Sequence, residues 1–85
     1  MPCATQIWTK AFAAQFDRLP DVVKRTVENH IDDMSRRLDS FPHGRLKGSA
    51  ACKMRAGDYR VIYDYDIKTY QVILHDVGNR KDIYR

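Results

Sequence analysis

Basic side chains are set into a run of strand-forming residues, KMRAGDYRVIYDY. Arg60 lies within its aromatic and β-branched part, and Lys53 and Arg55 lie just before it. A cation inside a sheet lowers stability unless an anion meets it. A guanidinium offers a planar fork to two phosphate oxygens, and an ammonium adds a mobile point charge. These residue types indicate a phosphate site, and an ion pair of Arg60 with Asp58 or Asp64 is the structural alternative.

A second basic segment, VGNRKDIYR, surrounds Tyr84 with Arg80, Lys81 and Arg85. A free phenol has a pKa near 10, so about one in a thousand is ionised at pH 7, and neighbouring cations lower that pKa. Tyr84 is therefore a candidate general base, and stacking on a nucleobase is an equally open role that needs no ionisation. Arg80 holds its proton too tightly to act as an acid, so we assign it to the phosphate.

If a phosphate ester is cleaved at this site, the leaving oxygen needs a proton from a general acid, and two side chains are candidates for it. His75 has a suitable intrinsic pKa, although alternation puts it on the same strand face as Ile73 and Val77, so a structural role is also open. Lys53 would serve if neighbouring arginines depress its pKa. No histidine, aspartate or cysteine residues have metal-ligand spacing, so neither a metal nor another cofactor is expected.

The first half of the chain predicts a strand followed by two helices. Residues 4–9 are rich in strand formers, and Thr9 caps a helix that continues to Pro20. Residues 21–38 then carry one apolar stripe at helical spacing, made of Val23, Val27, Ile31, Met34 and Leu38. Two such helices form a hairpin that is apolar on one face and needs a sheet to cover it.

The second half changes to the period of a strand. Strands are expected at residues 45–54, 59–65 and 70–77, with a break at Gly78 and Asn79 and a short final edge at 82–85. The fold class is therefore α+β: an N-terminal strand and helical hairpin packed on one face of a small twisted, mainly antiparallel four- to five-stranded sheet. Alternation directs Lys53, Arg55 and Arg60 together to the face away from the helices.

Length and composition limit the class of protein. The 85 residues, 44% of them hydrophobic, suit one domain over residues 1–85. No apolar run or secretion signal is evident, so we expect a cytoplasmic protein without a membrane segment, with Cys3 and Cys52 as thiols. Residues 1–42 carry six Lys/Arg and six Asp/Glu, whereas residues 43–85 carry nine and five. A polyanionic partner would explain this asymmetry, and a solvated surface is the alternative.

Three segments, in this order and at these spacings, resemble the RelE/ParE superfamily of bacterial type II toxin–antitoxin toxins, and more closely its RelE branch. The helical hairpin with LP at its break leads to LKGS, and KMRAGDYRVIYDY and VGNRKDIYR follow. The last two are similar to the family patterns R-x-G-x-Y-R-x-x-Y and V-G-x-R-x-x-x-Y. The resemblance covers nearly the whole chain and implies a single toxin domain.

The resemblance to the RelE branch implies a ribosome-dependent endonuclease that cuts mRNA in the A site by metal-independent attack of a 2′-hydroxyl. It also implies an antitoxin partner and contacts with the ribosome. The catalytic positions would be Lys53, Arg60, Arg80 and Tyr84, with Arg45, Lys47, Arg55, Lys81 and Arg85 binding RNA and His75 as the possible acid. Ala51 is a departure, because well-studied members have a further lysine there.

Two other functions stay open. ParE-like toxins share the fold and inhibit DNA gyrase, but they generally lack the terminal tyrosine and part of the basic set. A non-catalytic domain that binds RNA or the ribosome is the other alternative, because Ala51 removes one contributor to the chemistry.

Overall fold

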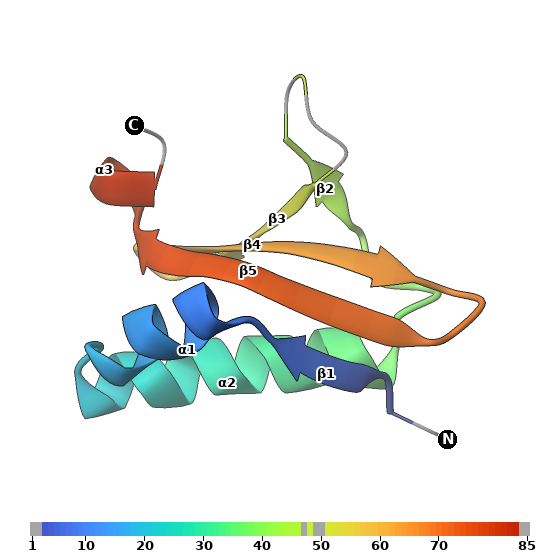
Figure 1. Ribbon diagram of the computed structural model, residues 1–85, viewed down its shortest axis with the longest axis horizontal. Coiled ribbons are helices and arrows are strands. Elements are labelled where there is room, and N and C mark those ends of the chain that lie inside the picture. Colours follow the sequence, from blue (N-terminus) through green and yellow to red (C-terminus); the bar gives the residue numbers. More distant parts are fainter. Residues whose placement is uncertain (1–2, 47, 49–50, 84–85) are drawn as a thin grey trace.

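Two helices cover one face of a five-stranded sheet in the computed structural model of the chain (Figure 1). The structure describes residues 3–46, 48 and 51–83. In chain order the elements are β1 (Thr5–Trp8), α1 (Lys10–Asp17), α2 (Asp21–Arg36), β2 (Gly44–Arg45), β3 (Cys52–Ala56), β4 (Tyr59–Asp66), β5 (Gln71–Asn79) and α3 (Arg80–Ile83). The predicted α+β fold, with its helical hairpin on one face of a mainly antiparallel sheet, is confirmed.

The helices form where their ends and their apolar faces are both satisfied. The Thr9 hydroxyl accepts a hydrogen bond of 3.2 Å from the Phe12 amide and so caps α1. Asp21 lies in the first turn of α2 and Arg36 in its last turn, which suits the helix dipole. The buried side of α2 is formed by Val27, Ile31, Met34 and Ser35. None of the described helices is both long and apolar enough to span a membrane.

The strand order is β1-β5-β4-β3-β2. β1 pairs in parallel with β5, and the other neighbouring strands are antiparallel. The N-terminal strand therefore forms one edge of the sheet and β2 forms the other. In Figure 1 the helices lie on one side of β4 and β5, while α3 and the β2–β3 hairpin project on the opposite side, which we call the open face.

The prediction of one strand over residues 45–54 is wrong. The chain forms two short antiparallel strands instead, Gly44–Arg45 and Cys52–Ala56, with Arg45 opposite Cys52. Two strands in place of one make β3 an inner strand at its beginning, where β2 pairs with it.

The prediction of a break at Gly78 and Asn79 is also wrong. Both residues continue β5, because they lie opposite Arg60 and Tyr59 of β4, and cross-strand pairing outweighs their preference for turns. The expected final strand at residues 82–85 is contradicted as far as Ile83, which ends the helix α3. Residues 84–85 are outside the described part of the chain.

A buried tyrosine fixes the loop between α2 and β2. Tyr63 is fully buried in β4, and its hydroxyl donates to His43 Nδ1 at 2.6 Å. His43 Nε2 in turn donates to the Leu38 carbonyl at 2.8 Å, and the imidazole stacks on Tyr65 with ring centroids 3.8 Å apart. Burial raises the pKa of the Tyr63 hydroxyl, so the phenol stays a donor. This network holds the loop against the end of the sheet.

Candidate nucleic-acid interface

Three cations share the open face near the turn between β3 and β4. Alternation in β3 leaves Lys53 and Arg55 exposed while Cys52 and Met54 are buried. Arg55 lies directly opposite Arg60 of β4 in the strand register. Side chains directly opposite each other on one face are close neighbours, and like charges in that position destabilise a sheet. This arrangement favours an anion that can bridge the two guanidinium groups.

Backbone carbonyls hold the Arg60 side chain. Its Nη1 donates to the carbonyls of Gly57 and Tyr59, each at 3.0 Å. No carboxylate whose side chain the structure describes lies within 4.0 Å of the guanidinium. The ion pair of Arg60 with Asp58 or Asp64 is therefore not formed.

The second basic segment starts beside the same turn. The Arg80 amide donates to the Asp58 carbonyl at 3.0 Å, and the Lys81 amide donates to Asn79 Oδ1 at 3.1 Å. Asp58, Asn79, Arg80 and Lys81 line a hollow of about 360 Å³. The structure thus brings Arg80 and Arg60 to one end of the sheet.

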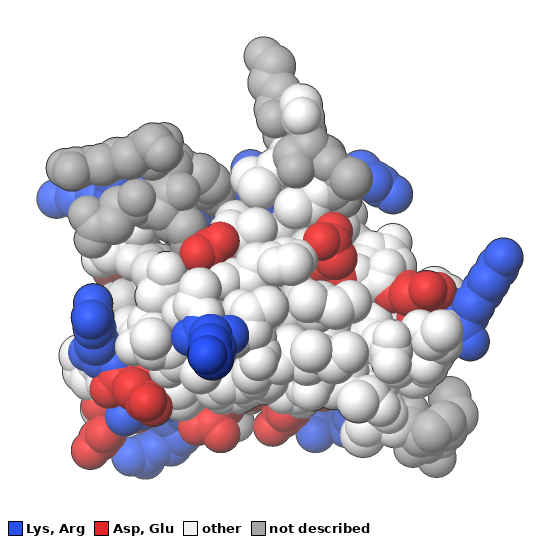
Figure 2. All heavy atoms as spheres, in the orientation of Figure 1, with Lys and Arg blue, Asp and Glu red and all other residues white. Residues whose placement is uncertain are grey.

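Other predicted RNA-binding residues are placed differently. Arg45 is exposed on β2, one strand away from the facing arginines. Lys47, Tyr84 and Arg85 lie outside the described residues. In the view of Figure 2, acidic and basic side chains are interspersed and no broad basic patch covers that side. The candidate site is defined by the residues around the β3–β4 turn that line the two hollows.

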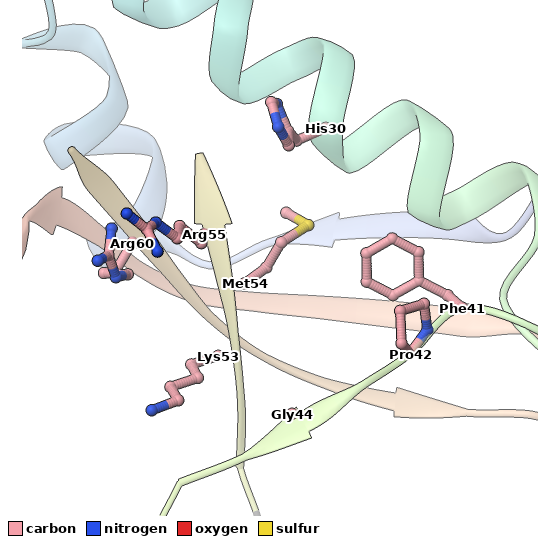
Figure 3. A pocket seen from close by; sticks show the side chains of 8 residues that line it. All are labelled: His30, Phe41, Pro42, Gly44, Lys53, Met54, Arg55 and Arg60. Atoms are coloured by element: carbon pink, nitrogen blue, oxygen red, sulfur yellow. The ribbon is translucent and has the colours of Figure 1, made fainter. Parts of the chain in front are cut away.

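A larger hollow lies between α2 and the sheet edge formed by β3 (Figure 3). Its volume is about 400 Å³, and its lining includes Lys53, Arg55 and Arg60. The remaining lining residues are His30, Phe41, Pro42, Gly44 and Met54, none of which the sequence analysis assigned to a site. His30 lies at the border of the apolar stripe of α2, and that position was the available sequence signal.

His75 does not join the facing arginines. Its Nε2 lies 2.7 Å from Asp64 Oδ2, and the two side chains are 38% and 45% exposed. Asp64 is four residues from Arg60 along β4, which is roughly 13 Å in an extended strand. The Asp64–His75 pair is therefore a separate feature of the open face.

An irregularity in the sheet explains the orientation of His75. Ile62 pairs with Asp76, whereas Tyr63 pairs with Leu74, so His75 is an extra residue in β5. Simple alternation predicted that His75 shares a face with Val77. That expectation is wrong, because Val77 is buried while His75 is partly exposed beside Asp64. Within the described part of the chain, no three His, Cys, Asp or Glu side chains come together as possible metal ligands.

Solved structures of RelE toxins resemble this fold. The chain matches RelBE2 of Mycobacterium tuberculosis with a TM-score of 0.77 and 22% identity, over 93% of this chain and 100% of that one. It matches the RelE–RelB complex of Pyrococcus horikoshii OT3 with a TM-score of 0.76 and 21% identity, over 95% and 99%. It matches a mutant of Escherichia coli RelE in the free state with a TM-score of 0.77 and 12% identity, over 98% of this chain and 90% of that one. These likenesses show the fold.

Sequence comparison identifies the family. No match was found among curated protein sequences. Residues 7–84 match the family model described as ParE toxin of type II toxin-antitoxin system, parDE. This match covers nearly the whole chain and agrees with the RelE-like fold. The chain therefore belongs to the ParE toxin family of type II toxin–antitoxin systems, within the RelE/ParE superfamily.

Proposed function

We propose that this toxin acts as RelE-type toxins do, as an endoribonuclease that cuts mRNA in the ribosomal A site. The observation that supports this proposal best is the pair of facing arginines, Arg55 and Arg60, at a hollow that Lys53 also lines. Charges arranged in this way favour an anion with several oxygens, and a phosphodiester in its transition state is such an anion.

The proposed reaction needs no metal. The 2′-oxygen loses its proton and bonds to the adjacent phosphorus, the bond from phosphorus to the 5′-oxygen breaks, and the leaving oxygen takes up a proton. The products are a 2′,3′-cyclic phosphate and a free 5′-hydroxyl. The protein must therefore supply a base, an acid and stabilisation of a pentavalent dianion.

Each residue of the candidate site has a proposed role in this reaction. Arg60 and Lys53 stabilise the dianion, and Arg55 supports them. Arg80 holds a non-bridging phosphate oxygen. Tyr84 acts as the base or stacks on a nucleobase. Lys53 is the proton donor, because His75 is held beside Asp64, away from the facing arginines. Removing one preorganised donor of this kind typically costs about 2.7–4 kcal/mol, or a factor of about 10² to 10³ in rate.

The ribosome would bind the toxin and orient its substrate. We assign Arg45, Lys47, Lys81 and Arg85 to RNA contacts, which makes binding weaken as salt rises because counterions are released. A cytoplasmic location follows from this target. An antitoxin is the expected protein partner, because related toxins have been solved as RelB–RelE complexes.

The decisive test is cleavage on purified ribosomes that hold a defined codon in the A site. We expect wild-type toxin to cut within that codon, and Arg60→Ala to cut about 10² to 10³ times more slowly. Lys68→Ala is the matched control, because it removes one exposed cation from the turn that follows β4, at the far end of that strand from Arg60. Equal rates for Arg60→Ala and Lys68→Ala would contradict the proposed role of Arg60.

Inhibition of DNA gyrase is the second candidate, because the matching family model carries the ParE name. Loss of DNA supercoiling, with intact message on the ribosome, would support it. Ribosomes that stall without any cut in the message would instead support a non-catalytic binding domain.

A further inference from the structure

We propose that the hollow between α2 and β3 binds one nucleobase, with the phosphate of the same nucleotide held by Arg55 and Arg60. The proposal rests on the proposed function in taking RNA as the source of that nucleotide. It adds a base-binding subsite, formed by residues that the catalytic assignment does not use. These residues are His30, Phe41, Pro42 and Met54.

One end of the hollow is cationic and the other is apolar, which matches the charged phosphate and the flat base of a nucleotide. Figure 3 shows Arg55 and Arg60 together at one end and the Phe41 and Pro42 rings at the other, with Met54 and His30 between them. A phosphate on the guanidinium groups would therefore direct an attached base along β3 toward the apolar end. No Asp or Glu lines the hollow, so nothing in its described wall repels an anion.

The apolar end is held rigid by contacts behind it. The Phe41 ring lies 5.0 Å from the Arg37 guanidinium carbon and 5.2 Å from the His43 ring. His43 is itself fixed by Tyr63 and by the Leu38 carbonyl. A preformed wall of this kind costs little ordering entropy when a planar ligand enters.

His30 provides the polar group that a base requires. Its Nδ1 lies 2.8 Å from the Thr26 carbonyl, and because a carbonyl only accepts, Nδ1 carries the proton. Nε2 of the neutral ring is then an acceptor, and it has no hydrogen-bond partner among the described residues. Every nucleobase has an N–H group that could donate to it.

The size of the hollow favours a single base over a partner helix. A volume of about 400 Å³ is near the lower end of the range for small-molecule sites. An amphipathic helix places anchors over two turns, or roughly 11 Å, and needs a longer groove. A short acidic peptide is the remaining competitor.

The test is an NMR titration of the full chain, labelled at backbone amides and methionine methyl groups, without ribosomes. We expect AMP, GMP, CMP or UMP to shift the Met54 methyl and to bind with a Kd on the order of 1 mM. Ribose 5-phosphate, which lacks the base, should bind at least threefold more weakly and leave the Met54 methyl unmoved. Equal binding of ribose 5-phosphate and every nucleotide would overturn the proposal.

Matched variants locate the base. His30→Ala should weaken nucleotide binding about three- to tenfold and leave ribose 5-phosphate binding unchanged, whereas Asn29→Ala, at the exposed neighbouring position, should change neither. Phe41→Leu gives a second test that keeps an apolar side chain. A glutamate- and leucine-containing peptide that shifts the Met54 methyl when nucleotides do not would overturn the proposal in favour of a protein partner.

Failure of this inference can be told apart from failure of the proposed function. Nucleotide binding without cleavage on the ribosome would contradict the nuclease and leave the subsite intact. Cleavage without mononucleotide binding, with the same base preference in wild type and His30→Ala, would contradict the subsite alone.

Discussion

The facing arginines predict an unusual result, in which loss of a charged residue makes the protein more stable and less active. Arg55 is exposed and has no hydrogen bond or ion pair with another described residue, whereas Arg60 donates to two carbonyls. Among the interactions with described residues, Arg55→Gln therefore removes this repulsion and no favourable contact. If the two charges are roughly 5 Å apart, as opposite Cβ atoms are, Coulomb's law in water gives about 0.8 kcal/mol.

The free energy of unfolding should therefore rise by about 0.2–1 kcal/mol in Arg55→Gln, which is a gain of about 1–8 °C in Tm for a domain of this size. Arg60→Gln behaves differently, because it also removes donors from the carbonyls of Gly57 and Tyr59. A double-mutant cycle separates these effects. Arg55→Gln should stabilise the wild type but not the Arg60→Gln variant.

Urea titrations at low salt measure the free energy of unfolding of the four proteins in the cycle. The same titrations in 1 M salt are the internal control, because the Debye length is then about 3 Å and the repulsion between the two arginines is screened. Cleavage on the ribosome, measured with the same proteins, should fall in both single variants. Destabilisation by Arg55→Gln, or an equal effect of it in both backgrounds, would refute the idea that the two arginines repel each other.

Three further results are expected. Arg80→Ala and Val27→Asp should both relieve growth arrest on expression, but circular dichroism should show that only Val27→Asp, which charges a fully buried position, unfolds the chain. His43→Ala should lower the free energy of unfolding by about 1–3 kcal/mol in urea titrations, because it leaves Tyr63 without its acceptor. Burial raises the pKa values of Tyr63 and Cys52 above their ordinary values of 10.0 and 9.0, so both side chains are neutral in the folded protein. Their contribution to the free energy of unfolding should therefore be constant below pH 9 and fall as the pH rises above these ordinary values, because only the unfolded chain then ionises. A urea midpoint that stays the same from about pH 8 to 11 would contradict this.

The periodic parts of the fold could be predicted from the sequence, because each of them buries one face. The apolar stripe of α2 and the alternation of β3 were both readable. That alternation also placed Lys53 and Arg55 on the open face together with Arg60. The position of these three cations follows from period alone, once the helices cover the other side.

The remaining features depend on partners that are distant in sequence. Gly78 and Asn79 are typical turn residues and predicted a break in the chain. Pairing with β4 instead keeps them in β5. The extra residue in β5 that turns His75 toward Asp64 has no local sequence mark. The base-sized hollow also could not be predicted, because His30 and Phe41 meet β3 only through the tertiary arrangement.

The parallel pairing of β1 with β5 has a consequence for how the toxin is made. Thr5 lies opposite Gln71, so β1 cannot pair until β5, more than 60 residues later in the chain, has been synthesised. Contacts between such distant segments form late in folding. A chain that is still being synthesised should therefore lack its complete sheet, and the toxin should reach its folded form only after β5 has been made.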